Sequence, residues 1–123
     1  MAQPKIRRAT DADWAAMFGP SAPAPQIWSG LVAATDHLVF GLGGIYGAVD
    51  GRWWITFARW PGIGMVKTAH QCGKILLGSA KEAGVAVHAL ADPDIEGSEL
   101  WIKRLGFEAT DETMGGLRVW VRR

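Results

Sequence analysis

The last third of the chain constrains the fold most. Residues 85–90 form a short apolar run that follows Gly84, which is typical of a buried central strand. Residues 98–105 then place apolar side chains three and four positions apart, the spacing of an amphipathic helix. Gly106 stops this helix, and Phe107 begins another extended segment. The sequence therefore predicts a buried strand, a helix and a further strand, in that order.

The rest of the chain supplies the other elements. Residues 10–13, Thr-Asp-Ala-Asp, offer a hydroxyl or carboxylate as the cap of a first helix. Asp50-Gly51 between apolar runs is a strong hairpin signal. Asp92 is a candidate cap for the last helix, with Pro93 at its first position. The expected order is a strand at 5–8, a helix around 14–18, strands at 27–34, 38–49 and 52–59, a helix over 66–83, a strand at 85–90, a helix over 93–105, and hairpin strands at 107–110 and 117–121.

Glycines inside two of these elements need a reason. The middle strand contains four of them, which predicts a bulge or the close approach of another backbone: Gly41, Gly43, Gly44 and Gly47. Gly73 and Gly78 lie inside the long helix, where each costs roughly 1 kcal/mol relative to alanine. Close packing of this helix on the sheet would explain the pair.

Composition excludes several classes of function. With 123 residues the chain is expected to form one domain, over 1–123, with a single core. A formal net charge of +1 favours neither nucleic acid nor a membrane surface as the partner. The only cysteine, Cys72, cannot form an internal disulfide, and no apolar run reaches the roughly 20 residues of a membrane helix. We therefore expect a cytoplasmic protein that binds a small molecule or another protein.

Few side chains fall into a chemical motif. His37, His70 and His88 share no metal-ligand spacing with Cys72, so no metal site is expected. Cys72 itself has the pattern of a small buried hydrophobe rather than a nucleophile. The chain also lacks a nucleophile elbow and a phosphate-binding P-loop. Chemistry must therefore be inferred from the order of elements.

That order resembles the GNAT superfamily of N-acetyltransferases across nearly the whole chain. Residues 98–107 are similar to the family's helix before its Gly-Phe step, and residues 5–10 to its Ile-Arg-x-Ala-Thr opening. The resemblance implies an α+β fold with a central mixed, mostly antiparallel sheet flanked by helices. It also implies transfer of an acetyl group from acetyl-CoA, the co-substrate, to a primary amine of a small molecule or protein.

A narrower resemblance is to phage-encoded GNAT-like proteins, including internal virion proteins of podoviruses. The shared features are a Gly-Gly-rich middle strand, a Trp-containing next strand, and an aromatic residue before the terminal glycine step. This resemblance implies an alternative function, a catalytically degenerate phage protein that acts as a virion or host-interaction factor. Its location would be the virion or the host cytoplasm. Its partners would be virion or host proteins. Independently of this resemblance, residues 117–121 are expected to form an edge strand, through which two copies would pair as a homodimer.

The family resemblance also implies where acetyl-CoA binds. Backbone N–H groups at the start of the long helix would hold the pyrophosphate, and the preceding strand would pair with the pantetheine arm. The family's glycine pattern is missing at 65–69, so the loop departs from it. The residues implied are Phe57, Ala58 and Arg59 on the strand, Gly62, Gly64 and Met65 in the loop, and Lys67 or Lys74 as charges. The alternatives are a simple turn after Pro61 and a solvated Arg59.

The catalytic positions of the family match less well. The tyrosine that protonates the leaving thiolate aligns near Ile102, which leaves this position apolar. Tyr46, the only tyrosine, would replace it if the middle strand lines the cleft, and is otherwise a strand-surface residue. His88 would accept the amine proton if it faces the cleft, and is otherwise a core histidine.

Two structural outcomes separate an enzyme from a noncatalytic protein. An enzyme predicts an open cleft lined by Arg59, Gly64 and Lys67. A scaffold predicts a cleft filled by Trp60 or Met65, with apolar surface buried against another chain. A third possibility, a small-ligand binder, predicts a pocket without phosphate donors.

Overall fold

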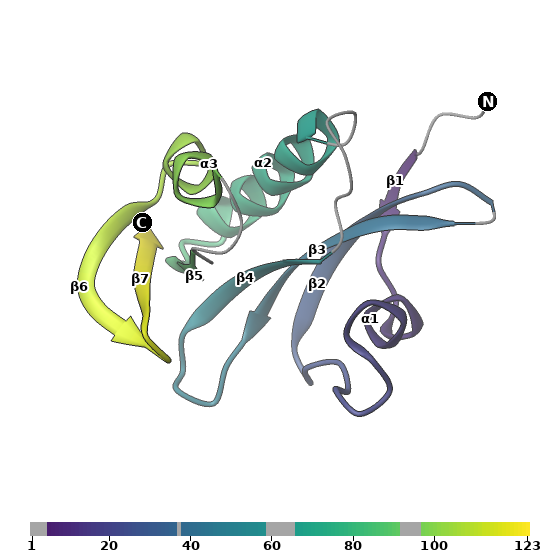
Figure 1. The fold of residues 1–123 in the computed structure, drawn as a ribbon, viewed down its shortest axis with the longest axis horizontal. Helices are drawn as coiled ribbons and strands as arrows, with labels where there is room; N and C mark the ends of the chain where they lie inside the picture. The colour runs from purple at the N-terminus through teal and green to yellow at the C-terminus, as the bar shows by residue number, and fades with distance from the viewer. Residues whose placement is uncertain (1–4, 37, 59–65, 92–96) are drawn as a thin grey trace.

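The computed structural model describes residues 5–36, 38–58, 66–91 and 97–123. In these ranges one sheet of seven strands, in the order β1-β2-β3-β4-β5-β7-β6, carries three helices (Figure 1). The elements are β1 (Lys5–Arg8), α1 (Asp11–Phe18), β2 (Trp28–Ala34), β3 (Val39–Gly47), β4 (Trp53–Ala58), α2 (Val66–Glu82), β5 (Val87–Leu90), α3 (Ser98–Arg104), β6 (Glu108–Met114) and β7 (Leu117–Arg122). The mixed, mostly antiparallel α+β sheet is confirmed, with β4 and β5 as its parallel pair.

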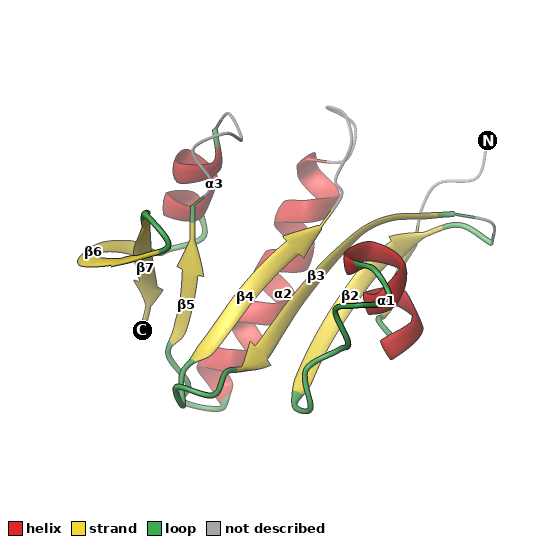
Figure 2. Ribbon diagram, turned by 60° about the horizontal axis from the view of Figure 1, so that its bottom comes forward, coloured by secondary structure: helices red, strands yellow, loops and turns green. Residues whose placement is uncertain are grey.

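Two hydrophobic clusters cover opposite faces of the sheet. α1 packs on one face, and α2 and α3 pack on the other (Figure 2). Because side chains alternate along a strand, Ile55 and Phe57 of β4 belong to the α2 face and Trp54 to the α1 face. The core of the α2 face includes Leu77, Val87 and other residues that are almost fully buried. No helix in the described ranges is both long enough and apolar enough to cross a membrane.

Thr10 and Asp13 fix the start of α1. The Thr10 hydroxyl accepts a hydrogen bond from the Asp13 N–H at 3.3 Å, and the Asp13 carboxylate accepts one from the Thr10 N–H at 2.8 Å. Arg7 on β1 donates two further hydrogen bonds to this carboxylate, at 2.8 and 3.0 Å. The predicted cap is confirmed, and through Asp13 it also ties β1 to α1.

Asp13→Asn is expected to lower the free energy of unfolding by about 2 kcal/mol at neutral pH. The hydrogen bonds from Arg7 hold the pKa of the Asp13 carboxyl at about 2, below its usual 3.8. The unfolded chain therefore takes up this proton first, so the contribution is complete above pH 3.8 and disappears as the pH falls through about 2. Urea unfolding of both proteins across this range measures the difference. A gap between them that stays constant down to pH 2 would contradict this assignment.

The glycines of β3 have two explanations. The predicted bulge is present, because the register of β2 and β3 shifts between Ala33 and Ala34 and leaves Phe40 unpaired beside Gly41. At Gly43 a side chain, rather than a backbone, comes close: an added Cβ would lie 2.9 Å from the ring of Phe57. β3 is therefore glycine-rich partly because aromatic rings from neighbouring strands lie across it.

Gly78→Ala is expected to stabilise the protein by about 1 kcal/mol, the helix-propensity difference, because no described atom lies within 4 Å of the added Cβ. Close packing therefore does not explain Gly78. It does explain Gly73, where a Cβ would meet Leu105 at 3.2 Å and Phe57 at 3.5 Å. In Gly73→Ala this crowding should cancel the propensity gain. Denaturant midpoints of the two variants measure the contrast, and equal stabilisation would contradict it.

Tight turns with left-handed glycines close two of the hairpins of the sheet. Gly51, with φ of +82°, joins β3 to β4, and Gly115 and Gly116, at +58° and +82°, join β6 to β7. The prediction that residues 117–121 form an edge strand is wrong, because β7 lies between β5 and β6. The edges of the sheet are β1 and β6, so a dimer cannot pair through β7.

Candidate functional site

β4 and β5 diverge after a short parallel pairing. They pair at two positions, Trp53 with Val87 and Trp54 with His88. β4 then continues to Ala58 and β5 to Leu90 with no further pairing between them in the described residues. We call the region between residues 55–58 and 89–90 the β4–β5 fork, and Figure 2 shows its strands separating toward their arrowheads. The main-chain groups of β4 and β5 that face each other across the fork are thus left without a strand partner among the described residues, while the outer sides of both strands stay paired with β3 and β7.

α2 connects the two strands of the fork. It begins close in sequence to the end of β4 and runs back along the sheet to β5 (Figure 2). The first N–H groups of a helix lack partners within it, and the helix dipole places partial positive charge there. Ligands of parallel sheets bind at the carboxyl ends of the strands, where such helices begin. The geometry therefore places an anion-attracting helix start at the open end of the fork.

Two aromatic rings flank the fork on the α2 face. Phe57 of β4 and Trp101 of α3 meet edge to face, with ring centroids 4.5 Å apart. The indole nitrogen of Trp101 is buried and has no hydrogen-bond partner among the described residues. Buried indole N–H groups nearly always have an acceptor, so this donor makes Trp101 a candidate binding residue. Trp101 lies on the apolar face that the spacing within residues 98–105 predicts, and a Trp on such a face is the sequence signal for this residue.

On the opposite face, one row of residues crosses three strands. Tyr46 of β3 pairs with Trp54 of β4, and Trp54 pairs with His88 of β5. His88 is half-buried at the last paired position before the fork. Its Nδ1 lies 3.3 Å from the carbonyl oxygen of Trp53. An Nδ1–H that donates to this carbonyl leaves Nε2 with a free lone pair, able to accept a proton.

Tyr46 lies one strand farther from the fork than Trp54. It is half-buried in the α1 cluster, with its ring centroid 6.1 Å from that of Trp14. Burial, and then the charge of Asp50, raise the pKa of its hydroxyl. The row places Trp54 between Tyr46 and His88, so the two residues lie two strands apart on the same face of the sheet. The catalytic role of Tyr46 stays a prediction.

Arg52 anchors this face from the side. Its guanidinium contacts Glu112 of β6 at 2.9 Å and Asp50 of the preceding turn at 2.8 Å. It also lies 4.9 Å from the centroid of the Trp54 ring. These contacts join residues far apart in sequence and hold the Trp54 ring, which lies 5.4 Å from the His88 ring.

The predicted cofactor-binding residues are only partly placed. Phe57 and Ala58 form the end of β4 within the fork, as expected. Lys67 lies in the first turn of α2, where its backbone alone is placed, and Lys74 is exposed two turns farther along. Outside the described residues lie Arg59, Gly62, Gly64 and Met65, together with Trp60, His37, Asp92 and Pro93. The assignment of Arg59, Gly62, Gly64 and Met65 to the cofactor site stays a prediction. The prediction that the last helix begins at Pro93 is wrong, because α3 begins at Ser98 and the preceding Gly97 has a left-handed φ of +80°, which interrupts a helix.

Cys72 and Ile102, two other residues considered for chemistry, lie in the hydrophobic core. Cys72 is fully buried, and burial raises the pKa of its thiol to about 11, which confirms it as a core residue. Ile102, at the position of the expected acid, is 7% exposed and packs in the α2-face core. Among the described residues, no three His, Cys, Asp or Glu side chains are grouped as metal ligands would be.

Solved structures share this architecture, although the chain matches no protein-family model and no curated protein sequence. A Klebsiella pneumoniae protein described as an acyl-CoA N-acyltransferase superposes with a TM-score of 0.71 at 12% identity, covering 97% of this chain and 96% of that one. A Bacillus subtilis acetyltransferase in complex with CoA gives 0.66 at 10% identity, covering 98% of both chains.

A phosphinothricin acetyltransferase of the GNAT superfamily from Sinorhizobium meliloti, in complex with acetyl-CoA, gives a TM-score of 0.65 at 14% identity. That match covers 98% of this chain and 88% of the other. None of these three structures is of a phage protein, so the narrower resemblance stays a prediction. Over nearly its whole length, the chain has the fold of the GNAT acetyltransferases.

Proposed function

We propose that the protein is an acyl-CoA-dependent N-acyltransferase that moves an acetyl group from acetyl-CoA to a primary amine. The observation that carries this proposal is the β4–β5 fork, which opens beside the start of α2. Solved proteins of the same fold are complexes with CoA and acetyl-CoA, which supports the same co-substrate here. Fold alone does not establish activity, so the argument rests on what the residues of the fork can do.

The fork offers two kinds of main-chain contact to acetyl-CoA. On the β5 side, groups of residues 55–58 have no strand partner in the described part of the chain, so they can pair with the amides of the pantetheine arm. The first N–H groups of α2 can bind the pyrophosphate, with Lys67 adding positive charge in the same turn. Lys74, about 12 Å farther along the helix axis, would contact only the outer part of the cofactor.

His88 is suited to accept the proton of the attacking amine. It lies where the fork closes, and the Trp53 carbonyl can hold its ring with Nε2 free. The amine nitrogen forms a bond to the thioester carbon and passes a proton to Nε2, and the C–S bond then breaks to release a thiolate. Main-chain N–H groups of the fork would stabilise the negative oxygen formed between these steps.

The leaving thiolate has no titratable side chain at the expected position, since Ile102 is apolar and buried. The unpartnered indole N–H of Trp101 can donate a hydrogen bond into the fork, but an indole does not give up its proton at neutral pH. The thiolate would therefore be stabilised by a hydrogen bond and take its proton from water or from protonated His88. A modest turnover rate is expected as a consequence.

Calorimetric titration with acetyl-CoA tests the binding half of this proposal. We expect saturable binding that weakens about tenfold in Lys67→Gln, because a charge-assisted phosphate contact is lost. Trp101→Phe keeps the aromatic packing, removes an N–H that has no partner in the described structure, and should also weaken binding about tenfold without lowering thermal stability. Lys81→Gln, in the last turn of α2, is the matched control and should bind like the wild type.

The opposite result is equally clear. No heat and no thermal stabilisation at about 1 mM acetyl-CoA would contradict the proposal, because a ligand bound to the native state must raise its stability. Equal weakening in Lys67→Gln and Lys81→Gln would show that the helix start is not the pyrophosphate site.

A noncatalytic role is the second candidate. The observation that favours it is the apolar environment of the expected acid, with Ile102 in the core and Tyr46 in the α1 cluster. Such a protein, including a virion or host-interaction factor, would retain the fold without acyl transfer. Binding of acetyl-CoA without transfer of its acetyl group to any primary amine tested would support this candidate over the first.

A further inference from the structure

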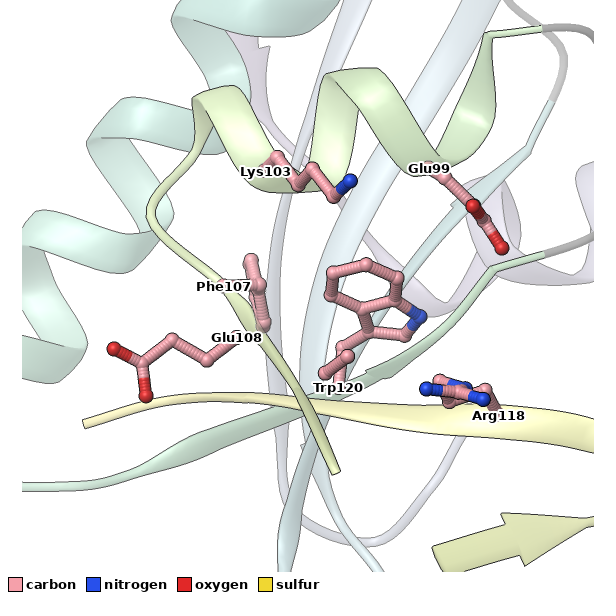
Figure 3. A pocket seen from close by; sticks show the side chains of 7 residues that line it. Glu99, Lys103, Phe107, Glu108, Arg118 and Trp120 are labelled. Carbon is pink, nitrogen blue, oxygen red and sulfur yellow. The ribbon is translucent and has the colours of Figure 1, made fainter. Parts of the chain in front are cut away.

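A hollow of about 530 Å³ lies against α3, away from the β4–β5 fork. It is lined by Glu99 and Lys103 of α3, Phe107 and Glu108 at the start of β6, and Arg118 and Trp120 of β7 (Figure 3). Successive helix residues are rotated by about 100°, so Glu99 and Lys103 share one side of α3 while Trp101 points to the other. The hollow and the fork therefore lie on opposite sides of the same helix.

Trp120 supplies an unused hydrogen-bond donor at this hollow. Its side chain is part of the core and 3% exposed, yet its indole nitrogen has no acceptor among the described residues. Figure 3 shows this nitrogen directed toward the space between Glu99 and Arg118. Lys103 approaches the ring itself, with its Nζ 5.8 Å from the ring centroid. A ligand oxygen near Arg118 would satisfy the donor.

The charged side chains around the hollow have no salt-bridge partner within the described part of the chain. The ion pairs found in the described ranges involve Arg7 and Arg52, and none includes Glu99, Lys103, Glu108 or Arg118. All four are exposed, so their charged ends can move to meet a ligand. Arg118 and the Trp120 N–H together suit a carboxylate, because both donate hydrogen bonds. Glu99, on the other side of the indole nitrogen, suits an ammonium group.

We propose that this hollow binds a free α-amino acid with an apolar side chain. The carboxylate accepts hydrogen bonds from Trp120 and Arg118, the ammonium group pairs with Glu99, and the side chain lies against Phe107, which is 4% exposed. The two charged groups of opposite sign on the ligand, both bonded to its Cα, match the two signs at the rim. The site uses no residue of the fork, so it does not depend on the proposed acyltransferase activity.

The test uses L-leucine as the probe and the indole N–H signals of the ¹⁵N-labelled protein as the readout. Trp120→Phe identifies the Trp120 signal. In the wild type, the chemical shift of this signal should change as L-leucine is added and reach a plateau with a Kd below about 10 mM. A Kd in this range is what exposed charge pairs support. Leucinamide lacks the carboxylate and N-acetyl-leucine lacks the amine, and each should bind about tenfold more weakly.

Variants then test the individual contacts. Arg118→Gln and Glu99→Gln should each weaken L-leucine about tenfold. Arg104→Gln, which removes a charge from α3 outside the hollow, should not. These surface substitutions leave the core intact, so the test stands even if Trp120→Phe fails to fold. A Trp120 signal unmoved by L-leucine, or moved equally by N-acetyl-leucine, would overturn the proposal. Acetyl-CoA should leave this signal in place whether or not it binds at the fork.

Discussion

His88→Gln is expected to lower kcat/KM for acetyl transfer about 100-fold while leaving the Kd for acetyl-CoA unchanged. Glutamine retains a hydrogen bond to the Trp53 carbonyl but cannot accept a proton from the amine. The variant should therefore still bind acetyl-CoA but lose the proton-transfer step. The rate is measured as the CoA that is released when the acetyl group passes to an amine, and this amine is first selected from a panel of primary amines. A thiol reagent reports only this CoA, since Cys72 is fully buried in the folded protein.

Tyr46→Phe is the matched control for this experiment. Tyr46 lies on the same row as His88 but beyond Trp54. Removal of its hydroxyl should therefore change the rate less than threefold, far less than the loss of a group that transfers a proton. A variant pair with the opposite behaviour, with His88→Gln active and Tyr46→Phe inactive, would transfer the role to Tyr46. Loss of activity together with loss of acetyl-CoA binding in His88→Gln would indicate a structural role instead.

Gly30→Ala is expected to destabilise the protein by about 3 kcal/mol, the upper range for overpacking a core. An added Cβ would lie 2.7 Å from the Trp28 ring and 2.8 Å from the carbonyl oxygen of Gly43. The carbonyl belongs to a central strand and cannot withdraw without breaking the β2–β3 ladder. Chemical unfolding measures the loss, with an unchanged m-value as evidence that the folded state keeps its compactness.

Gly44→Ala provides a close control, because Gly44 is the register partner of Gly30 and faces the same Trp28 ring. Its Cβ would meet the nearest atom at 3.5 Å, an ordinary van der Waals contact. Its stability should therefore stay within about 1 kcal/mol of the wild type. If the two variants lose the same amount, the cost comes from strand glycines in general and not from the contacts of Gly30.

Much of the fold follows from the sequence because the signals for it are local. The capping pair Thr10 and Asp13 lies three positions apart in the sequence, and the turns at Gly51 and Gly115 need only the positive φ that glycine allows. Hydrophobic periodicity likewise located α2, which buries one face, and a short apolar run after Gly84 located β5. The residues that make these interactions lie close together in the sequence, so the interactions can be predicted without knowing the tertiary neighbours.

The features that define the candidate site are not local. Residues 53–54 and 87–88 pair while the residues after them do not, and no pattern within β4 or β5 announces this divergence. Trp101 reads as a core residue until Phe57 is placed beside it and no acceptor is found for its indole N–H. The same holds for Trp120, whose free donor becomes visible only when α3 and β7 are brought together.

By itself, then, the sequence determined the order of elements, their caps and turns, and the apolar faces that bury them. Only the tertiary structure decided that β7 lies inside the sheet, that β4 and β5 separate into a fork, and that two buried indole donors lack partners in the described residues. The physical reason is that strand pairing and side-chain satisfaction depend on groups many positions apart, as Arg52 and Glu112 are. Local propensity cannot encode such contacts.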